Sequence, residues 1–166
     1  MRHDVLKEGD TSLEHDAHDE RWMSLALQAA DAAAVRGEVP VGAVVVRQGE
    51  LLAVAGNRRE AAQDFCAHAE LIAMRHAARA LGSWRLVECE VYVTLEPCPM
   101  CAGAMIQARV ARVIYGAPDP KGGFLGSCGD VRNIPGINHT FEVRSGVLSS
   151  ACGDRLRSFF RELRRR

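Results

Sequence analysis

Two short stretches most constrain the fold of this chain, His68-Ala69-Glu70 and Pro97-Cys98-Pro99-Met100-Cys101. Together they supply three soft or borderline metal ligands and one carboxylate, Glu70, that is not needed for ligation. A structural zinc usually takes four protein ligands, whereas a catalytic zinc takes about three and leaves a position open for water. Glu70 lies two residues past His68 and can reach that water without binding the metal. The fold must therefore bring both stretches to one point.

The two stretches also allow other interpretations. A Cys-x-x-Cys pair can be redox-active or form half of a structural zinc site, and His-x-Glu occurs often by chance. Cys66, two residues before His68, is a candidate fourth ligand that would close the open position. We expect Cys66 to be a small packing residue instead, because three ligands and Glu70 already form a complete catalytic set. Zinc suits sulfur and imidazole ligands, and it acidifies a bound water for attack on a substrate.

Hydrophobic periodicity predicts an alternation of strands and helices. Helices are expected at 19–36, 68–81, 98–108 and 149–166, strands at 41–46, 51–55, 89–95, 110–115 and 140–144, and loops at 58–65 and 118–123. Both ligand stretches then occupy the opening turn of a helix, where free N–H groups favour anions. A strand, a helix and a strand this close in sequence call for a parallel pair with a right-handed crossover. The sum is an α/β domain of three layers, with helices on both faces of a mixed sheet of about five strands.

Length and charge limit the organisation and the partners of the chain. A chain of 166 residues suits one domain, which we place at residues 19–166. Residues 1–18 are acidic and lack periodicity, so we expect a disordered or loosely packed extension there. The 21 basic and 21 acidic residues cancel, which excludes a global positive field for nucleic acid. Six arginines against two acidic residues at positions 154–166 nevertheless make the last helix basic.

The sequence also predicts the compartment. No stretch approaches the roughly 18 consecutive apolar residues of a membrane span, and the N-terminus lacks the basic start and apolar run of a secretory signal. We therefore expect a cytoplasmic protein whose six cysteines are thiols or metal ligands rather than disulfides. Of the six, Cys98 and Cys101 alone have the spacing that is typical of metal ligands.

The motifs resemble those of a known family. His-x-Glu followed by Pro-Cys-x-x-Cys is the signature of the zinc-dependent cytidine and adenine deaminases. Beyond this signature, residues 21–165 resemble the bacterial tRNA-specific adenosine deaminases of the cytidine and deoxycytidylate deaminase superfamily. The matching segments are Glu38-Val39-Pro40-Val41-Gly42-Ala43, Ala67-His68-Ala69-Glu70, Tyr92-Val93-Thr94-Leu95-Glu96-Pro97-Cys98, Cys101-Ala102-Gly103-Ala104, Asp119-Pro120-Lys121-Gly122, Asn138-His139 and Phe159-Phe160.

This resemblance implies a cytidine deaminase-like fold and hydrolytic deamination of the wobble adenosine, position 34 of a tRNA anticodon, to inosine with release of ammonia. It also implies one Zn2+ per subunit, attack of the activated water on C6 of the base, a homodimer, and an arginine tRNA as partner. The implied metal ligands are His68, Cys98 and Cys101, and the implied general base and acid is Glu70. The implied substrate-binding residues are Asn57 and the Ala69 backbone, which orient the purine, and Val39, Pro40, Asp119 and Phe160, which hold the flipped-out nucleotide and its neighbours.

Plainer alternatives remain for several of these positions. Asn57 could cap a turn, Asp119 could brace its own loop, and Phe160 could belong to the core. The arginines at positions 164–166 could bind RNA or satisfy the last carbonyls of their helix.

The chain departs from the family pattern beside the pocket. Asp64-Phe65-Cys66-Ala67 stands where the family usually has Asp-Pro-Thr-Ala, and Gly56 stands where an aromatic residue usually precedes the asparagine. These changes bear on substrate geometry more than on the reaction. A deaminase of a free nucleobase or nucleotide, of the guanine or cytosine type, is therefore the second hypothesis. A non-catalytic zinc or RNA-binding module is the hypothesis from a different class.

Overall fold

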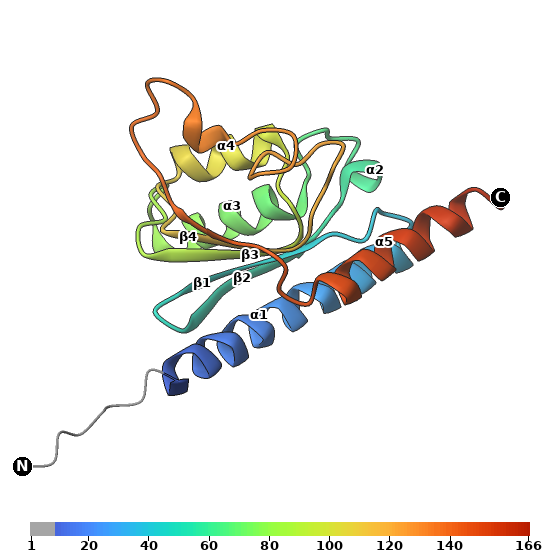
Figure 1. Cartoon of the computed structure of the whole chain (residues 1–166). Helices are drawn as coiled ribbons and strands as arrows, with labels where there is room; N and C mark the ends of the chain where they lie inside the picture. The colour runs from blue at the N-terminus through green and yellow to red at the C-terminus, as the bar shows by residue number, and fades with distance from the viewer. Residues whose placement is uncertain (1–8) are drawn as a thin grey trace, which may run out of the picture.

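The computed structural model describes residues 9–166, with side chains from residue 13 onward. A five-stranded sheet lies between two layers of helices, with strand order β2-β1-β3-β4-β5 (Figure 1). The strands are β1 (Gly42–Arg47), β2 (Glu50–Gly56), β3 (Cys89–Leu95), β4 (Arg112–Ala117) and β5 (Glu142–Arg144). The helices are α1 (Gly9–Val35), α2 (Arg59–Ala62), α3 (Ala69–Leu81), α4 (Pro99–Gln107) and α5 (Ser149–Leu163), with a 3-10 turn at Val131–Asn133. The predicted three-layer α/β architecture with five strands is confirmed.

The sheet is mixed, as predicted. β1 and β2 form an antiparallel hairpin whose two turn residues, Gln48 and Gly49, both have positive φ. Such turns match the twist of the paired strands. β1 also pairs antiparallel with β3, whereas β3–β4 and β4–β5 are parallel. The parallel pair places the ends of β3 and β4 at the same edge of the sheet, and the stretch 97–101 follows β3 closely.

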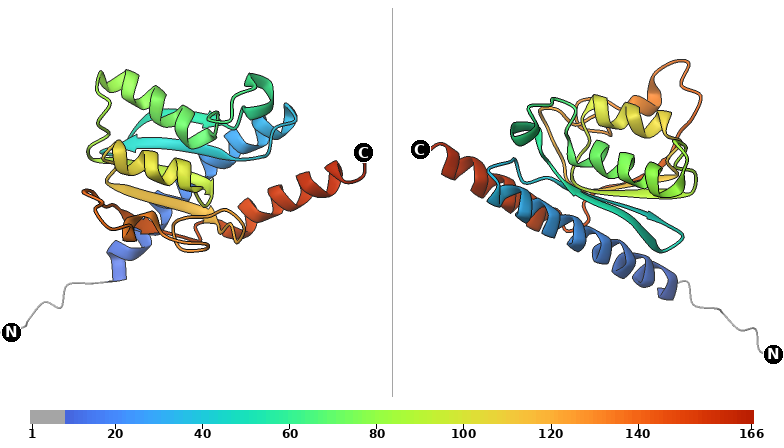
Figure 2. Two further views of the ribbon diagram at one scale, coloured as in Figure 1. Left: turned by 90° about the horizontal axis from the view of Figure 1, so that it is seen from above. Right: turned by 180° about the vertical axis from the view of Figure 1, so that it is seen from behind.

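The helices divide between the two faces of the sheet. α1 and α5 lie on one face, and α3 and α4 lie on the other (Figures 1 and 2). The second half of α5 extends beyond the sheet, and the C-terminus lies away from the body of the domain (Figure 2). None of the helices in the described range is both long and apolar enough to cross a membrane.

Alternating side chains of the strands build one core on each face. Val45 and Val91 belong to the core under α3 and α4, whereas Val44 and Tyr92 belong to the core under α1. All of these side chains are completely buried. Gly42 lets α1 approach the sheet, because a Cβ at this position would lie 1.9 Å from a backbone oxygen of that helix. The sheet is thereby packed between two apolar cores.

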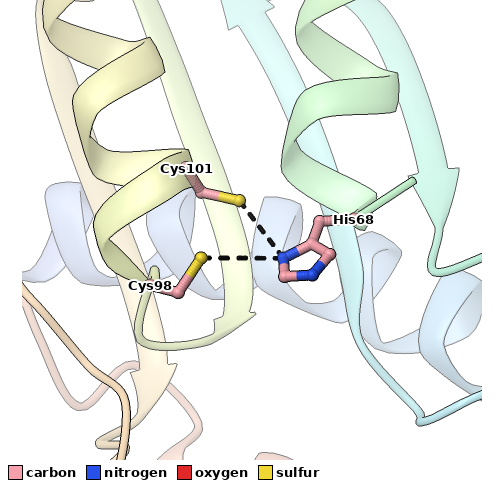
Figure 3. Close-up of side chains that lie close together, drawn as sticks. All are labelled: His68, Cys98 and Cys101. Atoms are coloured by element: carbon pink, nitrogen blue, oxygen red, sulfur yellow. Dashed lines mark hydrogen bonds between the residues drawn. The ribbon is translucent and has the colours of Figure 1, made fainter. Parts of the chain in front are cut away.

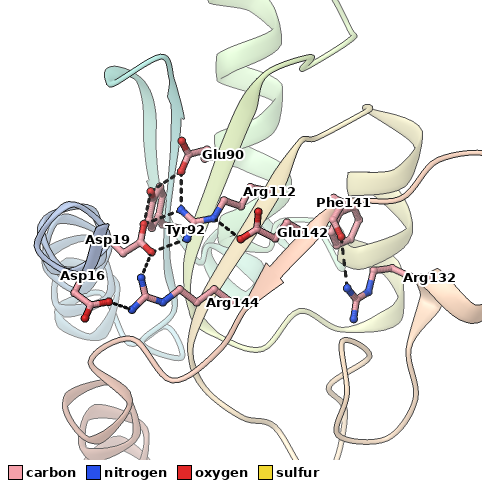
Figure 4. Close-up of polar contacts among 9 residues, drawn as sticks. All are labelled: Asp16, Asp19, Glu90, Tyr92, Arg112, Arg132, Phe141, Glu142 and Arg144. Carbon is pink, nitrogen blue, oxygen red and sulfur yellow. Dashed lines mark hydrogen bonds and ion pairs between the residues drawn. The ribbon is translucent and has the colours of Figure 1, made fainter. Parts of the chain in front are cut away.

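Helix α1 begins ten residues before the predicted start. The extension predicted to be loose is helical from Gly9 onward, while residues 1–8 lie outside the described range. The reason is a network of ion pairs that the periodicity of the sequence does not reveal (Figure 4). Asp16, within the extension, pairs with Arg144, and the completely buried Asp19 accepts hydrogen bonds from Arg112 at 2.7 and 2.8 Å. These contacts with β4 and β5 hold the first half of α1 on the sheet.

A second difference lies in the predicted loop at 58–65, which contains the short helix α2. The buried carboxylate of Glu38 accepts hydrogen bonds from the backbone N–H groups of Glu60 at 3.2 Å and Ala61 at 2.8 Å. These are the free N–H groups at the start of α2, and they are capped by a residue from another segment. The cap is distant in sequence, so a local pattern does not predict it.

Candidate metal centre and active site

Both ligand stretches lie at helix starts, as predicted. His68 is the N-cap of α3, and Cys98 is the N-cap of α4, with Pro99 as the first residue of that helix. Cys101 lies in the first turn of α4, and its side chain points toward His68 (Figure 3). The free N–H groups and the positive dipole end of α4 favour negative charge at this position. The fold thus brings the two stretches to one point.

The three predicted ligands have the spacing that zinc requires. Nδ1 of His68 lies 3.7 Å from Sγ of Cys98 and 3.4 Å from Sγ of Cys101 (Figure 3). A tetrahedral zinc with Zn–S near 2.3 Å and Zn–N near 2.05 Å places its sulfur and nitrogen ligands about 3.6 Å apart. One imidazole and two thiols are also the donor types that zinc prefers. The residues present therefore fit a zinc ion held by three protein ligands.

Proton affinities within the cluster are strongly perturbed. The hydrogen bond from Cys101 is the main cause that lowers the pKa of Cys98 to about 4, against the opposing effect of burial. The same hydrogen bond and burial raise the pKa of Cys101, and the contact with Cys98 raises the pKa of His68. The pKa of one thiol is thus lowered and that of the other is raised, and a divalent cation that binds here displaces the protons that these ligands hold.

Glu70 is the only carboxylate in the first turn of α3. Its side chain is 4% exposed, and burial raises its pKa to about 7, despite opposing hydrogen bonds and the nearby His68. A carboxyl group with a pKa near neutrality can both accept and return a proton at physiological pH. The position and the pKa of Glu70 thus suit proton transfer beside the metal.

Cys66 does not join the ligand cluster. Its Sγ lies 3.8 Å from Sδ of Met100, and its backbone N–H donates to Asp64. Among the described residues, the group of ligand atoms within 4.8 Å of one another here contains His68 and the two cysteines of α4, without Cys66. The expectation that Cys66 is a packing residue agrees with this contact.

A cavity of about 180 Å³ lies directly against the cluster. It brings together six of the predicted site residues: Val39, Asn57, His68, Glu70, Cys98 and Asp119. Asn57 is buried at the exit of β2, and its backbone N–H donates to Val41 at 3.0 Å. Ala69 is the buried first residue of α3, where backbone N–H groups lack partners within the helix.

Two predicted substrate-binding residues lie elsewhere. Pro40 lines a separate cavity of about 340 Å³ between α1 and α5, together with Phe159. Phe160 lines a groove of about 820 Å³ between α5 and the loop after β4, and it is partly exposed. The groove shares Val39, Leu95 and Asp119 with the cavity at the metal cluster, so the two adjoin. Phe160 therefore lines the neighbouring groove and not the cavity itself.

The groove is basic. Its charged lining consists of Asp119 and four cationic side chains, Lys121, Arg157, Arg161 and Arg164. The arginine-rich end of α5 thus supplies local positive charge to a chain whose total charge is zero.

Asp119 braces its own loop, which was the plainer of its two interpretations. Its Oδ1 accepts hydrogen bonds from the backbone N–H groups of Lys121 at 3.0 Å and Gly122 at 3.1 Å. This is the turn that aspartate side chains commonly stabilise. The residue still lines both the cavity and the groove, so the two roles are compatible.

Four residues of the cavity wall have no predicted role: Val41, Arg59, Leu95 and Glu96. Glu96 is 2% exposed; burial raises its pKa, but hydrogen bonds from Ser127 and from backbone N–H groups outweigh burial and lower it. The sequence contains one signal for Glu96: a carboxylate at the end of an apolar strand, directly before Pro97, is unusual and indicates a special role. Arg59 lies on α2, where an irregular loop was predicted.

Known proteins share both the sequence and the fold. Residues 16–117 match the family described as the cytidine and deoxycytidylate deaminase zinc-binding region. The tRNA-specific adenosine deaminase of Bacillus subtilis is 50% identical over 148 residues, which cover 89% of this chain and 92% of that protein. The tRNA-specific adenosine deaminase of Agrobacterium fabrum is 47% identical over 143 residues, or 86% of this chain and 94% of that protein.

Solved structures extend the comparison. A structure from work on A-to-I editing by tRNA:A34 deaminases at the wobble position has a TM-score of 0.78 and 45% identity, over 82% of this chain and 99% of that chain. A guanine deaminase from Nitrosomonas europaea, with a TM-score of 0.73 and 24% identity over 96% of this chain and 98% of that chain, shares the fold. These matches confirm the resemblance that the motifs predict. The chain belongs to the cytidine and deoxycytidylate deaminase family and, within it, to the tRNA-specific adenosine deaminases.

Proposed function

We propose that this chain catalyses the zinc-dependent hydrolytic deamination of adenosine 34, the wobble position of a tRNA anticodon, to inosine with release of ammonia. The observation that carries the proposal is the arrangement of three zinc-type ligands and the buried Glu70 at a small cavity that adjoins a basic groove. The identity to tRNA-specific adenosine deaminases supports the same reaction.

The proposed zinc ligands are His68, Cys98 and Cys101, with one ion per subunit. Bound there, zinc supplies the Lewis acidity that lowers the pKa of a water from about 15.7 to about 7. Glu70 takes the proton of the water as general base and then delivers a proton to the amino group that leaves C6 as ammonia. The C6–O bond forms by addition across C6=N1, with N1 taking a proton, and the C6–N bond breaks in the elimination that follows, so one water is consumed and one ammonia is released for each inosine.

The cavity walls hold the base. A volume of about 180 Å³ accepts a single nucleobase and not a length of RNA, so the target nucleotide must leave its stack to enter. Asn57 and the free N–H of Ala69 orient the purine, and Val39 packs against its face. Asp119 stands at the mouth of the cavity, where the ribose of the flipped nucleotide would pass.

The groove holds the nucleotides that flank the target. Single-stranded RNA loops are recognised by basic side chains that follow the backbone and by aromatic side chains on which bases stack. Arg157, Arg161 and Lys121 supply the charge, and the partly exposed Phe160 supplies the aromatic surface. Pro40 directly follows Val39 and restricts the backbone of that segment. A free-base deaminase would not need this groove.

The finer features of the proposal rest on the family resemblance. They are an arginine tRNA as the partner, with its anticodon stem-loop as the bound part, a homodimer as the working form, and a cytoplasmic location. In the proposed homodimer, residues of both subunits form the RNA-binding surface.

A substrate panel tests the proposal. The purified protein is incubated with a tRNA transcript that carries adenosine 34, with free adenosine, with cytidine and with guanine, and both ammonia and inosine are measured. The expected result is inosine and ammonia from the tRNA alone, and no ammonia from a matched transcript with guanosine 34. Deamination of a free base or nucleoside with none of the tRNA would replace the proposal with the free-nucleobase alternative.

A further inference from the structure

The carboxylate of Glu96 is enclosed by the loop that follows β4. Oε2 accepts hydrogen bonds from the backbone N–H of Asp119 at 2.9 Å and from the hydroxyl of Ser127. Oε1 accepts from the backbone N–H groups of Leu125 and Ser127, both at 3.0 Å. Four donors from one loop thus converge on a single side chain that is 2% exposed. The loop is wrapped around this carboxylate.

Two further contacts fix the same loop against the metal-binding segment. The backbone N–H of Phe124 donates to the carbonyl of Pro97 at 2.9 Å, directly before the ligand Cys98. Gly123 lies against the carboxylate, because a Cβ at Gly123 would be 2.3 Å from Cδ of Glu96. Glu96 and Pro97 therefore join the loop to the chain segment that leads into the metal site.

The partners of Glu96 explain why a charged residue stands at this position. All four donors found among the described residues are uncharged backbone or hydroxyl groups. A carboxylate only accepts hydrogen bonds, so it can hold several converging N–H groups at once, which an amide or an apolar side chain cannot. A buried charge that is stabilised only by one loop holds that loop in one place, because moving the loop would leave the charge unsatisfied.

We propose that Glu96 is a positioning residue for RNA binding, which fixes the cavity wall at Asp119 relative to the zinc ligand Cys98. This inference rests on the proposed function, since it concerns the grip on the same flipped-out nucleotide. Glu96 lies within the wall that contains both Asp119 and Cys98. It acts through the loop and has no part in proton transfer, so its loss affects substrate binding and not the chemical step.

The substitution Glu96→Gln tests this role with almost no change in shape. The amide oxygen of glutamine can keep two N–H donors, but its NH2 group must then face the N–H of Asp119, and two donors repel each other. The matched control is Glu90→Gln, which makes the same change at the other end of β3, in the network of Arg112. Amide hydrogen exchange of the 118–128 segment, zinc content, and kcat and KM on the adenosine-34 tRNA are measured for both variants and for the unaltered protein.

In Glu96→Gln, we expect faster exchange at 118–128, unchanged zinc, and a KM for tRNA raised about tenfold, as for one lost hydrogen bond to a charged group, with kcat within about twofold. Glu90→Gln should leave exchange at 118–128 and KM unchanged. A lower kcat with unchanged KM would overturn the role, because a merely structural residue lowers only the amount of active protein. Unchanged exchange at 118–128 in Glu96→Gln would also overturn it, because Glu96 would then not hold the loop.

A second variant approaches the same contact from the loop. Gly123→Ala places a methyl group against the Glu96 carboxylate, and it should give the same exchange and KM signature even where Glu96→Gln does not fold. An unaltered protein that does not deaminate the tRNA would refute the proposed function, and the role in RNA binding with it. The exchange measurement still decides separately whether Glu96 holds the loop.

Discussion

The substitution Asp19→Asn tests how the first half of α1 is held on the sheet. Asp19 is completely buried and accepts hydrogen bonds from three residues: Arg112 at 2.7 and 2.8 Å, Arg144 at 2.5 Å and Tyr92 at 2.9 Å (Figure 4). Asparagine keeps the shape but loses the charge and turns an NH2 group toward a guanidinium. The ion pairs on this residue are thereby broken.

The structure sets the size of the effect. Breaking a buried ion pair costs about 3–5 kcal/mol, chiefly because the remaining charge is left buried and unpaired. Here the remaining charges keep other partners, since Arg112 also contacts Glu90 at 3.1 Å and Glu142 at 3.3 Å, and Arg144 also contacts Asp16. We therefore expect the lower limit, a loss of about 3 kcal/mol in the free energy of unfolding.

Urea unfolding followed by circular dichroism measures this loss. With a slope of about 2 kcal/mol per molar urea, the midpoint should fall by about 1.5 M. The control is Asp31→Asn on the same helix, where Asp31 pairs with Arg155 at 2.7 Å but is 53% exposed. An exposed pair contributes at most about 1 kcal/mol, so this midpoint should shift by less than about 0.5 M. Equal zinc content in all samples excludes an indirect effect through the metal.

The pH dependence has a defined sign. Burial raises the pKa of Asp19, but hydrogen bonds from Arg112, Tyr92 and Arg144 outweigh it and hold the pKa below its ordinary value of 3.8. The stability from this carboxylate is therefore fully present above 3.8 and is lost as the pH falls through the lower value in the folded protein. The difference between the unaltered protein and Asp19→Asn should be constant near neutral pH and shrink in acid. Equal midpoint shifts for the two variants at neutral pH would refute the reasoning.

Three further predictions concern the site. Glu70→Gln should keep the fold and the zinc, measured by circular dichroism and metal analysis, but lower kcat by about 100-fold to 10,000-fold; retained turnover would remove Glu70 from proton transfer. Metal analysis should find about one zinc per chain. A chelator or the substitution Cys98→Ala should remove both the zinc and the formation of inosine. Added zinc should then restore inosine formation in the chelated unaltered protein but not in Cys98→Ala. Arg161→Ala should weaken tRNA binding and reduce by about 1 the magnitude of the slope of the logarithm of the binding constant against the logarithm of the salt concentration. The control Arg79→Ala, at an exposed position of α3, should change neither quantity. Equal effects of the two substitutions would place the RNA outside the groove.

Local patterns in the sequence predicted the strand pairings of the sheet and the two helix starts at His68 and Cys98. The helix start at Cys98 could be predicted because β3 ends just before it and prolines stand on both sides of it. The helix start at His68 could be predicted because a helical pattern of apolar residues begins directly after it. The hairpin of β1 and β2 and the parallel pair of β3 and β4 follow from alternation and from short connections. The cluster of His68, Cys98 and Cys101 could be predicted for the same reason, since its members are few and lie in short motifs.

The features that depend on contacts between distant segments could not be predicted from the sequence. The early start of α1 depends on Asp16 and Arg144, which are 128 positions apart, and α2 depends on a cap from Glu38. Glu96 gains its surroundings only when the loop after β4 folds back over it. A pattern of neighbouring residues contains none of this information, so these features require the structure.

Oxygen-18 labelling of the product tests the central claim most directly. The protein and an adenosine-34 tRNA transcript are incubated in water enriched in oxygen-18, and the nucleosides are then analysed by mass spectrometry. Hydrolytic deamination predicts inosine at position 34 only, with one heavy oxygen and one ammonia for each inosine, and almost none with Glu70→Gln. Absence of inosine, or inosine without the heavy oxygen, would contradict the claim that this site activates water to deaminate the wobble adenosine.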